Sequence, residues 1–414
     1  MGDTGMTAFL FTNGRVLDPR HEGVRDGMEV LVEGGTIREV SDRPIRSADA
    51  ARVDLDGRVL MPGLIDAHVH VVAAMADLAA NAAQQSSLAA LRAGRIMTAM
   101  LMRGFTTVRD VGGADRGLAE AQAAGVVAGP RLVISGKALS QTGGHCDMRA
   151  RADDRAPSQH RVGAMGRLCD GVEAVRLAAR EELRAGADFV KVMANGGIAS
   201  PTDPIHMLQF SRAELLAAVE EAVNNGTYVS AHLYTDAAIR RAVECGVHSL
   251  EHCNLIAPDT AALAAAAGCV AVPTLVTYER LAIEGASLGL RPDSVAKIET
   301  VRQAGLDSLA VMQAAGLPMA YGSDLLGEMH RHQSGEFALR ARVLPAMDVL
   351  RSATTLAARL CRLEGRAGII EPGADADLIV VDGNPLDDWT LLEDQGARIP
   401  TIMQAGRFVK RDLG

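Results

Sequence analysis

Two histidines, His68 and His70, lie two positions apart at the end of the segment PGLIDAHVH, residues 62–70. Residues two apart on a β-strand point to the same face, so both imidazoles project from one face of the strand that this apolar segment predicts. Neutral imidazole is a common ligand of divalent metals. A pair of solvent-facing histidines is the alternative, but a position at the end of a predicted strand favours a metal site.

A lysine, Lys191, lies inside the otherwise apolar segment DFVKVM, residues 188–193. Burial of an unpaired ammonium is costly, and such a lysine loses its proton readily. A neutral amine can react with carbon dioxide to form a carbamate, whose two oxygens can bridge two cations. The alternative is a buried lysine paired with a carboxylate, and the segment alone leaves both interpretations open.

Three further residues that can bind metals end predicted strands. His232 closes the segment VSAH, His252 follows SLE, and Asp324 ends YGSD. One such residue alone would usually be structural. Together with the histidine pair and Lys191, they lie at the ends of the first, fourth, fifth, sixth and eighth predicted strands, and this indicates one shared metal centre.

The middle of the chain, residues 61–362, alternates short apolar strands with Ala-rich helical segments such as 212–224 and 236–245. This alternation is typical of an α/β fold with a parallel sheet and crossover helices. Eight such units in a row predict a closed (β/α)8 TIM barrel, whose chemistry lies at the C-terminal ends of the strands. The predicted strands are residues 64–70, 106–110, 132–135, 189–193, 228–232, 249–251, 271–274 and 319–321.

Both ends of the chain, residues 1–60 and 363–414, consist of short strand patterns separated by Gly and Pro. Asn13-Gly14 and Gly34-Gly35 are hairpin signals in the N-terminal part. Strands are predicted at residues 376–381, 401–403 and 407–410 in the C-terminal part. We expect the two ends to form one small composite β-sandwich.

The composition limits the partners. The 414 residues carry a net charge of −9 and a pI near 5.7, which argues against binding to a nucleic-acid backbone. No signal peptide and no apolar run of membrane-spanning length is evident, so a cytoplasmic protein without a membrane partner is expected. The six cysteines form no CxxC pair, and reduced thiols are expected.

Taken together, PGLIDAHVH, the lysine within a strand, the two histidines at strand ends and the GSD segment resemble the binuclear amidohydrolase superfamily, over essentially the whole chain. The resemblance implies two divalent cations, for which the nitrogen and oxygen ligands suit zinc, while manganese, cobalt and iron are tolerated. It places His68, His70 and Asp324 on the more buried cation, His232 and His252 on the outer one, and carboxylated Lys191 between them.

A finer resemblance is to the Xaa-Pro dipeptidase (prolidase-like) branch, which includes imidazolonepropionase-like and ochratoxin-hydrolysing members. It is carried by TVRD (107–110), GGHCD (143–147), ANGG (194–197) and HLYT (232–235). In that branch, the histidine after Gly-Gly contacts the oxygen of the scissile carbonyl, and the tyrosine binds the α-carboxylate of the substrate. These residues would be His145 and Tyr234; a loop histidine and an ordinary buried tyrosine are the alternatives.

The resemblance implies a hydrolase for the amide bond of Xaa-Pro dipeptides or of N-acyl and N-aminoacyl L-amino acids, ochratoxin-type amides included. Two cations would deliver hydroxide to the carbonyl, and Asp324 would carry the proton to the leaving amine. The loop after the seventh strand, around residues 276–280, would form the side-chain pocket, with Arg280 or Arg331 adding positive charge. A homo-oligomer is expected.

Three alternatives remain. A cyclic-amide (imidazolone-type) hydrolase shares the fold but uses one cation and lacks the bridging lysine, so Lys191 argues against it. A phosphotriesterase or lactonase shares the binuclear centre. A scaffold without metal or activity is a third alternative, which the complete ligand set disfavours.

Overall fold

The computed structural model describes residues 8–288 and 292–413. The chain divides into two compact units, of which the first contains residues 1–65, 99–107 and 345–414, and the second residues 66–98 and 108–344. Within the described ranges, none of the helices combines the length and apolar character that a membrane crossing requires.

The first unit is built on an eight-stranded sheet to which both ends of the chain contribute. Its strand order is β17-β16-β15-β5-β1-β2-β3, and β4 pairs with β1. The N-terminal and C-terminal strands meet where β15 pairs antiparallel with β5. The strands are β1 (Ala8–Val16), β2 (Arg25–Glu33), β3 (Thr36–Ser41), β4 (Ala51–Asp54), β5 (Val59–Pro62), β15 (Leu378–Val381), β16 (Thr401–Gln404) and β17 (Arg407–Arg411).

One of the two predicted hairpin turns is wrong. Asn13 and Gly14 lie inside β1, which continues to pair with β2 on both sides of a register shift between Phe11 and Gly14. Asn13 adopts a left-handed φ of 56°, so the local signal produces a bulge within the strand rather than a reversal. The hairpin at Gly34-Gly35 does form, between β2 and β3.

Short helical segments complete this unit. They are α11 (Ala346–Ser352), α12 (Thr355–Leu360), η2 (Trp389–Leu392) and η3 (Asp394–Gly396). A core cluster of buried side chains unites the two ends of the chain, because it includes Phe11, Val30 and Leu60 together with Leu378 and Met403.

The second unit contains parallel strands and the helices that connect them. One sheet has the order β10-β9-β11-β12-β13-β14, and a second sheet has the order β6-β7-β8. The strands are β6 (Leu64–Val69), β7 (Phe105–Asp110), β8 (Arg131–Ile134), β9 (Ala138–Ser140), β10 (Gly166–Leu168), β11 (Val190–Met193), β12 (Val229–Thr235), β13 (Ser249–Leu255) and β14 (Val270–Val272); β6 and β7 begin in the first unit.

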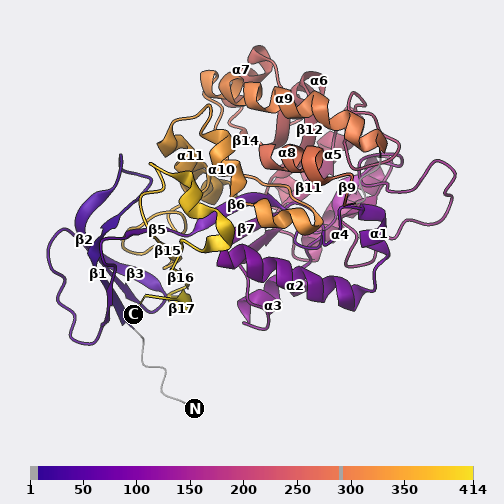
Figure 1. Cartoon of the computed structure of the whole chain (residues 1–414). Coiled ribbons are helices and arrows are strands. Elements are labelled where there is room, and N and C mark those ends of the chain that lie inside the picture. Colours follow the sequence, from indigo (N-terminus) through magenta and orange to yellow (C-terminus); the bar gives the residue numbers. More distant parts are fainter. Residues whose placement is uncertain (1–7, 289–291, 414) are drawn as a thin grey trace. The chain divides into compact units, whose positions relative to one another are not determined.

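Helices alternate with these strands along the chain, and Figure 1 shows α6 and α7 at the outer edge of this unit. The chain therefore has the predicted α/β fold with parallel strands and crossover helices. The helices and helical turns are α1 (Leu78–Ala83), α2 (Ser86–Met102), α3 (Arg116–Ala123), α4 (Val172–Arg184), α5 (Arg212–Asn224), α6 (Asp236–Glu244), α7 (Pro258–Ala266), α8 (Leu275–Glu284), α9 (Pro292–Ala314), η1 (Gly327–His332) and α10 (Gly335–Arg340).

Seven of the eight predicted strands coincide with β6, β7, β8, β11, β12, β13 and β14. The eighth, residues 319–321, forms only an isolated bridge between Met319 and Ala271. This segment nevertheless makes backbone hydrogen bonds on two sides, because the amide of Ala320 donates to Ala271 O and Tyr321 O accepts from the amide of Ala67. The segment therefore lies between two strands, as an eighth strand would, but it does not form a continuous series of β-bridges with either of them.

Candidate active site

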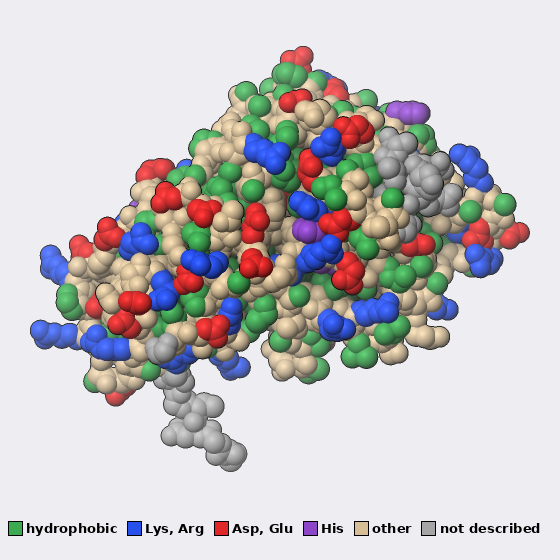
Figure 2. Space-filling model, in the orientation of Figure 1, with side chains coloured by type: hydrophobic (Ala, Val, Ile, Leu, Met, Phe, Trp, Pro, Cys, Tyr) green, Lys and Arg blue, Asp and Glu red, His purple; other side chains and the backbone are tan. Residues whose placement is uncertain are grey.

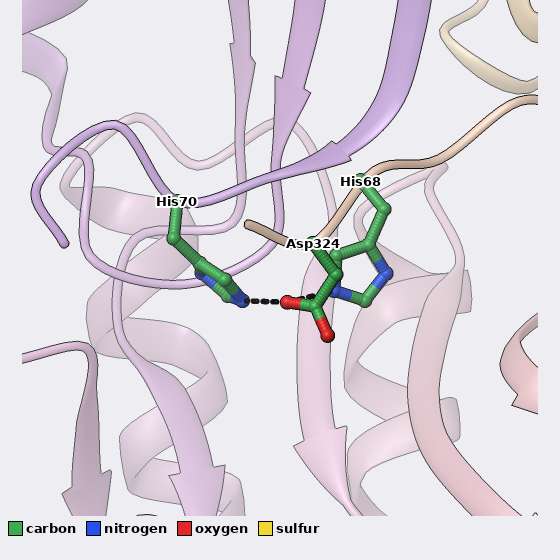
Figure 3. Close-up of side chains that lie close together, drawn as sticks. All are labelled: His68, His70 and Asp324. Carbon is green, nitrogen blue, oxygen red and sulfur yellow. Dashed lines mark ion pairs between the residues drawn. The ribbon is translucent and has the colours of Figure 1, made fainter. Parts of the chain in front are cut away.

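The first group of predicted ligands lies close together. Nε2 of His68 and Nε2 of His70 are each 3.3 Å from Oδ1 of Asp324, and the three side chains point toward one another in Figure 3. Both histidines are buried, on or directly after β6. The three residues form a group that could hold a metal ion, since each offers one ligand atom and these atoms lie within 4.8 Å of one another.

Hydrogen bonds to Nδ1 of each of these two histidines orient the ring so that Nε2 faces Asp324. Nδ1 of His70 donates to Gly112 O over 2.9 Å, and Nδ1 of His68 lies 2.7 Å from Oε2 of Glu251. A carbonyl oxygen only accepts, so Nδ1 of His70 carries a proton, and Nε2 is the nitrogen that faces Asp324. A carboxylate behind a histidine has the same effect in metal sites.

Glu251 is itself buried on β13 and belongs to a charged network. Burial alone would raise its pKa, but the guanidinium of Arg109 and the ammonium of Lys191 hold the pKa of this carboxyl well below its usual range. Arg109 donates to Oε1 of Glu251 over 2.7 Å, and the hydroxyls of Ser230 and Ser249 donate to the same oxygen. The Glu251 carboxylate is therefore ionised beneath the ligand group.

The second group consists of residues on adjacent strands. His232 lies on β12 and His252 on β13, with Nδ1 of His232 at 2.9 Å from Nε2 of His252. Nδ1 of His252 is 2.8 Å from the hydroxyl of Thr274. Burial, together with neighbouring positive charge, lowers the pKa of both imidazoles well below the usual value. Both rings are therefore neutral, the form in which histidine binds metals.

Lys191 is 1% exposed on β11, where it pairs in register with Ser230 of β12, two residues before His232. Its Nζ has no hydrogen-bond partner among the described residues, and no ion pair of Lys191 is found there. Burial lowers its pKa to about 8. A buried amine without a partner is rare in native structures and calls for a ligand or a modification.

His145 is held by the loop that follows β11. Its Nδ1 lies 2.6 Å from the hydroxyl of Ser200 and 3.4 Å from Oδ2 of buried Asp203. Asp203 also accepts from the amide of Gly197 over 3.0 Å and from the side chain of Gln209 over 2.9 Å. The His145 ring stacks on His232 with 4.2 Å between ring centroids. Nδ1 of His145 therefore contacts residues of this loop and does not face the cavity with a free lone pair or proton.

The loop is tied down from α9 by Lys297. Its ammonium donates to three backbone carbonyls, those of Gly197, Ser200 and Asp203, at 2.8, 3.3 and 3.0 Å. The two residues that contact Nδ1 of His145 therefore lie in a fixed loop.

Tyr234 meets the ring of His232 edge-to-face, whereas His145 stacks on it. Its ring is 4.8 Å from the ring of His232 and 5.2 Å from that of His252, and its hydroxyl accepts from the hydroxyl of Tyr278 over 3.1 Å. Burial raises the pKa of both phenols, so both stay protonated and can act as donors.

The structure brings all eight predicted site residues to a single cavity of about 50 Å³. The first of them, His68, and the last, Asp324, are 256 positions apart in the sequence (324 − 68). The eight residues are His68, His70, His145, Lys191, His232, Tyr234, His252 and Asp324.

Other expectations about the site need correction. Residues 276–280 belong to helix α8, not to a loop, although Tyr278 does line the cavity. Arg280 and Arg331 do not line it; both are within ion-pair distance of Glu284. Neither arginine therefore supplies positive charge at the cavity wall.

Four residues that support the site were not predicted. Arg109 and Glu251 could have been found, because charged residues inside apolar strands indicate a buried pair. Asp203 and Ser200 lie in a segment without periodicity, and nothing local indicates that they contact His145.

Comparisons with known proteins identify the family of the chain. The chain matches the amidohydrolase family over residues 59–409. A crystal structure of an amidohydrolase is 52% identical, with a TM-score of 0.97 over 99% of this chain and 100% of the other. A prolidase in complex with N-methylphosphonate-L-proline is 51% identical, with a TM-score of 0.96 over 98% of this chain and 100% of the other.

A curated relative is ochratoxinase of Aspergillus niger, 31% identical over 85% of this chain and 76% of the relative. The crystal structure of A. niger ochratoxinase has a TM-score of 0.85 and 28% identity over 98% of this chain and 96% of the other. The chain belongs to the amidohydrolase family and is a hydrolase that acts on amide bonds.

Proposed function

We propose that this enzyme is a binuclear metal-dependent amidohydrolase that cleaves the amide bond between an acyl or aminoacyl group and a C-terminal L-amino acid, such as that of Xaa-Pro dipeptides. The observation that carries the proposal is that Lys191, whose Nζ has no hydrogen-bond partner among the described residues, lines one cavity with five histidines and Asp324. The similarity to a prolidase and to an ochratoxinase supports this substrate class.

The donor set fits two divalent cations. His68, His70 and Asp324 would hold one, while His232 and His252 would hold the other. Lys191, carboxylated on the amine that burial keeps readily deprotonated, would bridge both. Nitrogen and oxygen donors of this kind suit zinc. When bound, such cations polarise a carbonyl and lower the pKa of water.

Asp324 is the residue we assign to proton transfer. Burial would raise its pKa, but the neighbouring imidazoles, His68 first, hold it well below the usual value. It therefore stays ionised and can accept a proton at its carboxylate. From there it can return the proton to the nitrogen of the leaving amino acid.

His145 and the tyrosines would hold the two ends of the reacting amide. With Nδ1 of His145 turned to Ser200 and Asp203, its Nε2 is free to contact the carbonyl oxygen, an interaction worth about 2.7–4 kcal/mol in comparable sites. Tyr234, whose oxygen accepts from the hydroxyl of Tyr278, would donate to the α-carboxylate, at about 1.5–3 kcal/mol for a bond to a charged acceptor.

We further propose that residues 61–362 form a closed (β/α)8 barrel and that residues 1–60 and 363–414 form a β-sandwich. Backbone bonds from Asp188 to Ile134 and from Ala67 to Tyr321 support closure between the two parallel sheets. The enzyme would act on small molecules and not on nucleic acid. It would form a homo-oligomer. On the face shown in Figure 2, basic and acidic side chains are interspersed, with no broad basic area.

Elemental analysis and a substrate screen test this proposal. We expect about two metal ions per chain, and release of a free amino acid from dipeptides or N-acyl amino acids. A preparation that folds but binds no metal would overturn the proposal. Turnover of lactones or phosphotriesters without amide cleavage would overturn the substrate class.

A further inference from the structure

Thr274 is buried at the start of α8, and its hydroxyl does not cap that helix. A threonine at this N-cap position ordinarily accepts a hydrogen bond from one of the first backbone amides of the helix. In α8 the carboxylate of Glu336 accepts from the amide of Val276 instead, over 2.7 Å, and a carboxylate suits the N-terminal end of a helix. The hydroxyl of Thr274 is therefore available to other partners.

The hydroxyl of Thr274 contacts two side chains of the candidate active site. Its Oγ1 lies 2.8 Å from Nδ1 of His252 and donates to the hydroxyl of Tyr278 over 3.4 Å. Tyr278 in turn donates to the hydroxyl of Tyr234 over 3.1 Å. These three contacts form a continuous series of hydrogen bonds from His252 to Tyr234, which we call the hydroxyl relay.

The hydroxyl relay runs in one direction, because each hydroxyl has a single proton to donate. The proton of Thr274 points to Tyr278, so Oγ1 accepts from Nδ1 of His252. The other ring nitrogen of His252, Nε2, faces Nδ1 of His232, the second proposed ligand of the outer cation. At the far end, the oxygen of Tyr234 accepts from Tyr278, and its own proton remains for a substrate carboxylate.

Burial makes the two ends of the hydroxyl relay dependent on each other. All four of its side chains are at most 3% exposed, and hydrogen bonds in series polarise one another where water is excluded. An anion at Tyr234 would therefore make Oγ1 of Thr274 a stronger acceptor for Nδ1 of His252. A stronger acceptor behind a histidine raises the basicity of its ligating nitrogen.

We propose that Thr274 is a positioning residue, whose hydroxyl couples the binding of the substrate α-carboxylate to the proposed metal ligand His252. This inference rests on the proposed function and adds a selectivity to it. Coupling between two sites is reciprocal, so a carboxylate at Tyr234 strengthens metal binding by His252, and metal at His252 strengthens carboxylate binding. Esters and amides of the same amino acids cannot draw on this coupling.

Thr274→Val removes the hydroxyl and keeps the shape of the side chain. With the best substrate of the screen and its methyl ester, we expect kcat/KM to fall roughly tenfold more for the acid than for the ester, through KM. Thr274→Ser, which keeps a hydroxyl, should restore the wild-type ratio of acid to ester. An unchanged ratio in Thr274→Val would overturn the proposal, because a merely structural role would affect acid and ester equally.

Thr260→Val on α7 is the matched control. Thr260 is buried like Thr274, but its hydroxyl has no hydrogen-bond partner among the described residues. The variant loses the same group from the interior of the protein without a change in the hydroxyl relay. Its ratio of acid to ester should equal that of the wild type, and a shift as large as that of Thr274→Val would overturn the proposal.

A double variant tests whether Thr274 acts through Tyr278. Tyr278→Phe interrupts the hydroxyl relay between Thr274 and Tyr234. In that background, Thr274→Val should therefore cause no further change in the ratio of acid to ester. Additive changes in the double variant would show that the two residues act independently, and would overturn the relay.

Zinc affinity gives a readout that does not depend on turnover. Measured on metal-free protein by competition with a chromophoric chelator, it should fall roughly 10–100-fold in Thr274→Val, the range for groups that support a metal ligand. Thr274→Ser and Thr260→Val should keep the wild-type affinity. An unchanged zinc affinity in Thr274→Val would overturn the coupling to His252.

Calorimetry with L-proline, L-phenylalanine and L-leucine separates this inference from the proposed function. If no amide is cleaved but one amino acid binds, and Thr274→Val weakens its binding while Thr260→Val does not, the proposed function fails and the hydroxyl relay stands. If amides are cleaved and Thr274→Val binds the amino acids as the wild type does, the relay fails and the proposed function stands. Binding of none of the three would also overturn the relay.

Discussion

Gly197 provides the space in which the imidazole ring of His145 lies, because a Cβ atom at position 197 would overlap that ring. The same glycine donates its amide to Asp203, which contacts Nδ1 of His145. A loop residue without a side chain thus determines the position of the histidine that we assign to the carbonyl oxygen.

Gly197→Ala should therefore displace His145 and lower kcat by about 10²-fold or more, the range for loss of one such donor. Metal content should not change. Gly335→Ala on α10 is the control, since a Cβ there meets only Val276 at 3.4 Å, and it should retain wild-type kcat. Wild-type kcat in Gly197→Ala would remove the role of His145.

Asp203→Asn tests the loop as a positioning device. The amide keeps the size of the side chain but weakens the hold on Nδ1 of His145, so kcat should fall about 10–100-fold, as for similar supporting residues. In a double-mutant cycle with His145→Ala, the two losses should be far from additive. Additive losses, with lower thermal stability, would indicate a merely structural Asp203.

Lys191→Ala should abolish most of the activity and reduce the metal content, because the bridging position would be lost. Metal per chain, measured by elemental analysis, and turnover should fall together. Unchanged metal content and turnover would rule out Lys191 as a ligand.

Tyr234→Phe should raise KM for substrates with a free α-carboxylate more than for their methyl esters, because it removes a phenol donor from the proposed anchor. Tyr278→Phe should show the same selectivity, since the two hydroxyls are 3.1 Å apart. Equal effects on acids and esters in both variants would argue for a packing role.

Arg109→Met tests the buried charge network. It leaves the Glu251 carboxylate without its guanidinium partner, and breaking a buried pair costs roughly 3–5 kcal/mol. The urea midpoint of the metal-free variant should fall well below that of the wild type. Arg109→Lys, which keeps the charge, should lose less. A midpoint unchanged in Arg109→Met would show that Glu251 needs no counter-charge.

The sequence predicted the elements that carry the site better than the loops that complete it. Strand periodicity placed His68 and His70 correctly at the end of β6, because a local apolar run specifies this strand. It placed His232 and His252 on the right strands, but β12 and β13 continue past them to Thr235 and Leu255. Residues 319–321 were predicted as a strand, yet make one bridge only, and their placement depends on hydrogen bonds to distant segments.

The contact between Asp203 and His145 could not be predicted from the sequence, because it too depends on residues far apart in the chain. Asp203 is 58 positions from His145 (203 − 145 = 58), in a segment whose conformation depends on carbonyl contacts with Lys297. Local patterns specify a strand but contain no information about such a distant partner.

The hydrogen bond between Glu251 and His68 bears on how the enzyme would take up its metal ions. Glu251, anchored by Arg109 from within the fold, orients the His68 ring without help from any ion. Protein contacts alone therefore hold His68 in the group that we propose as a metal site, and we expect the enzyme to stay folded after chelation and to regain activity when metal is added, without a refolding step.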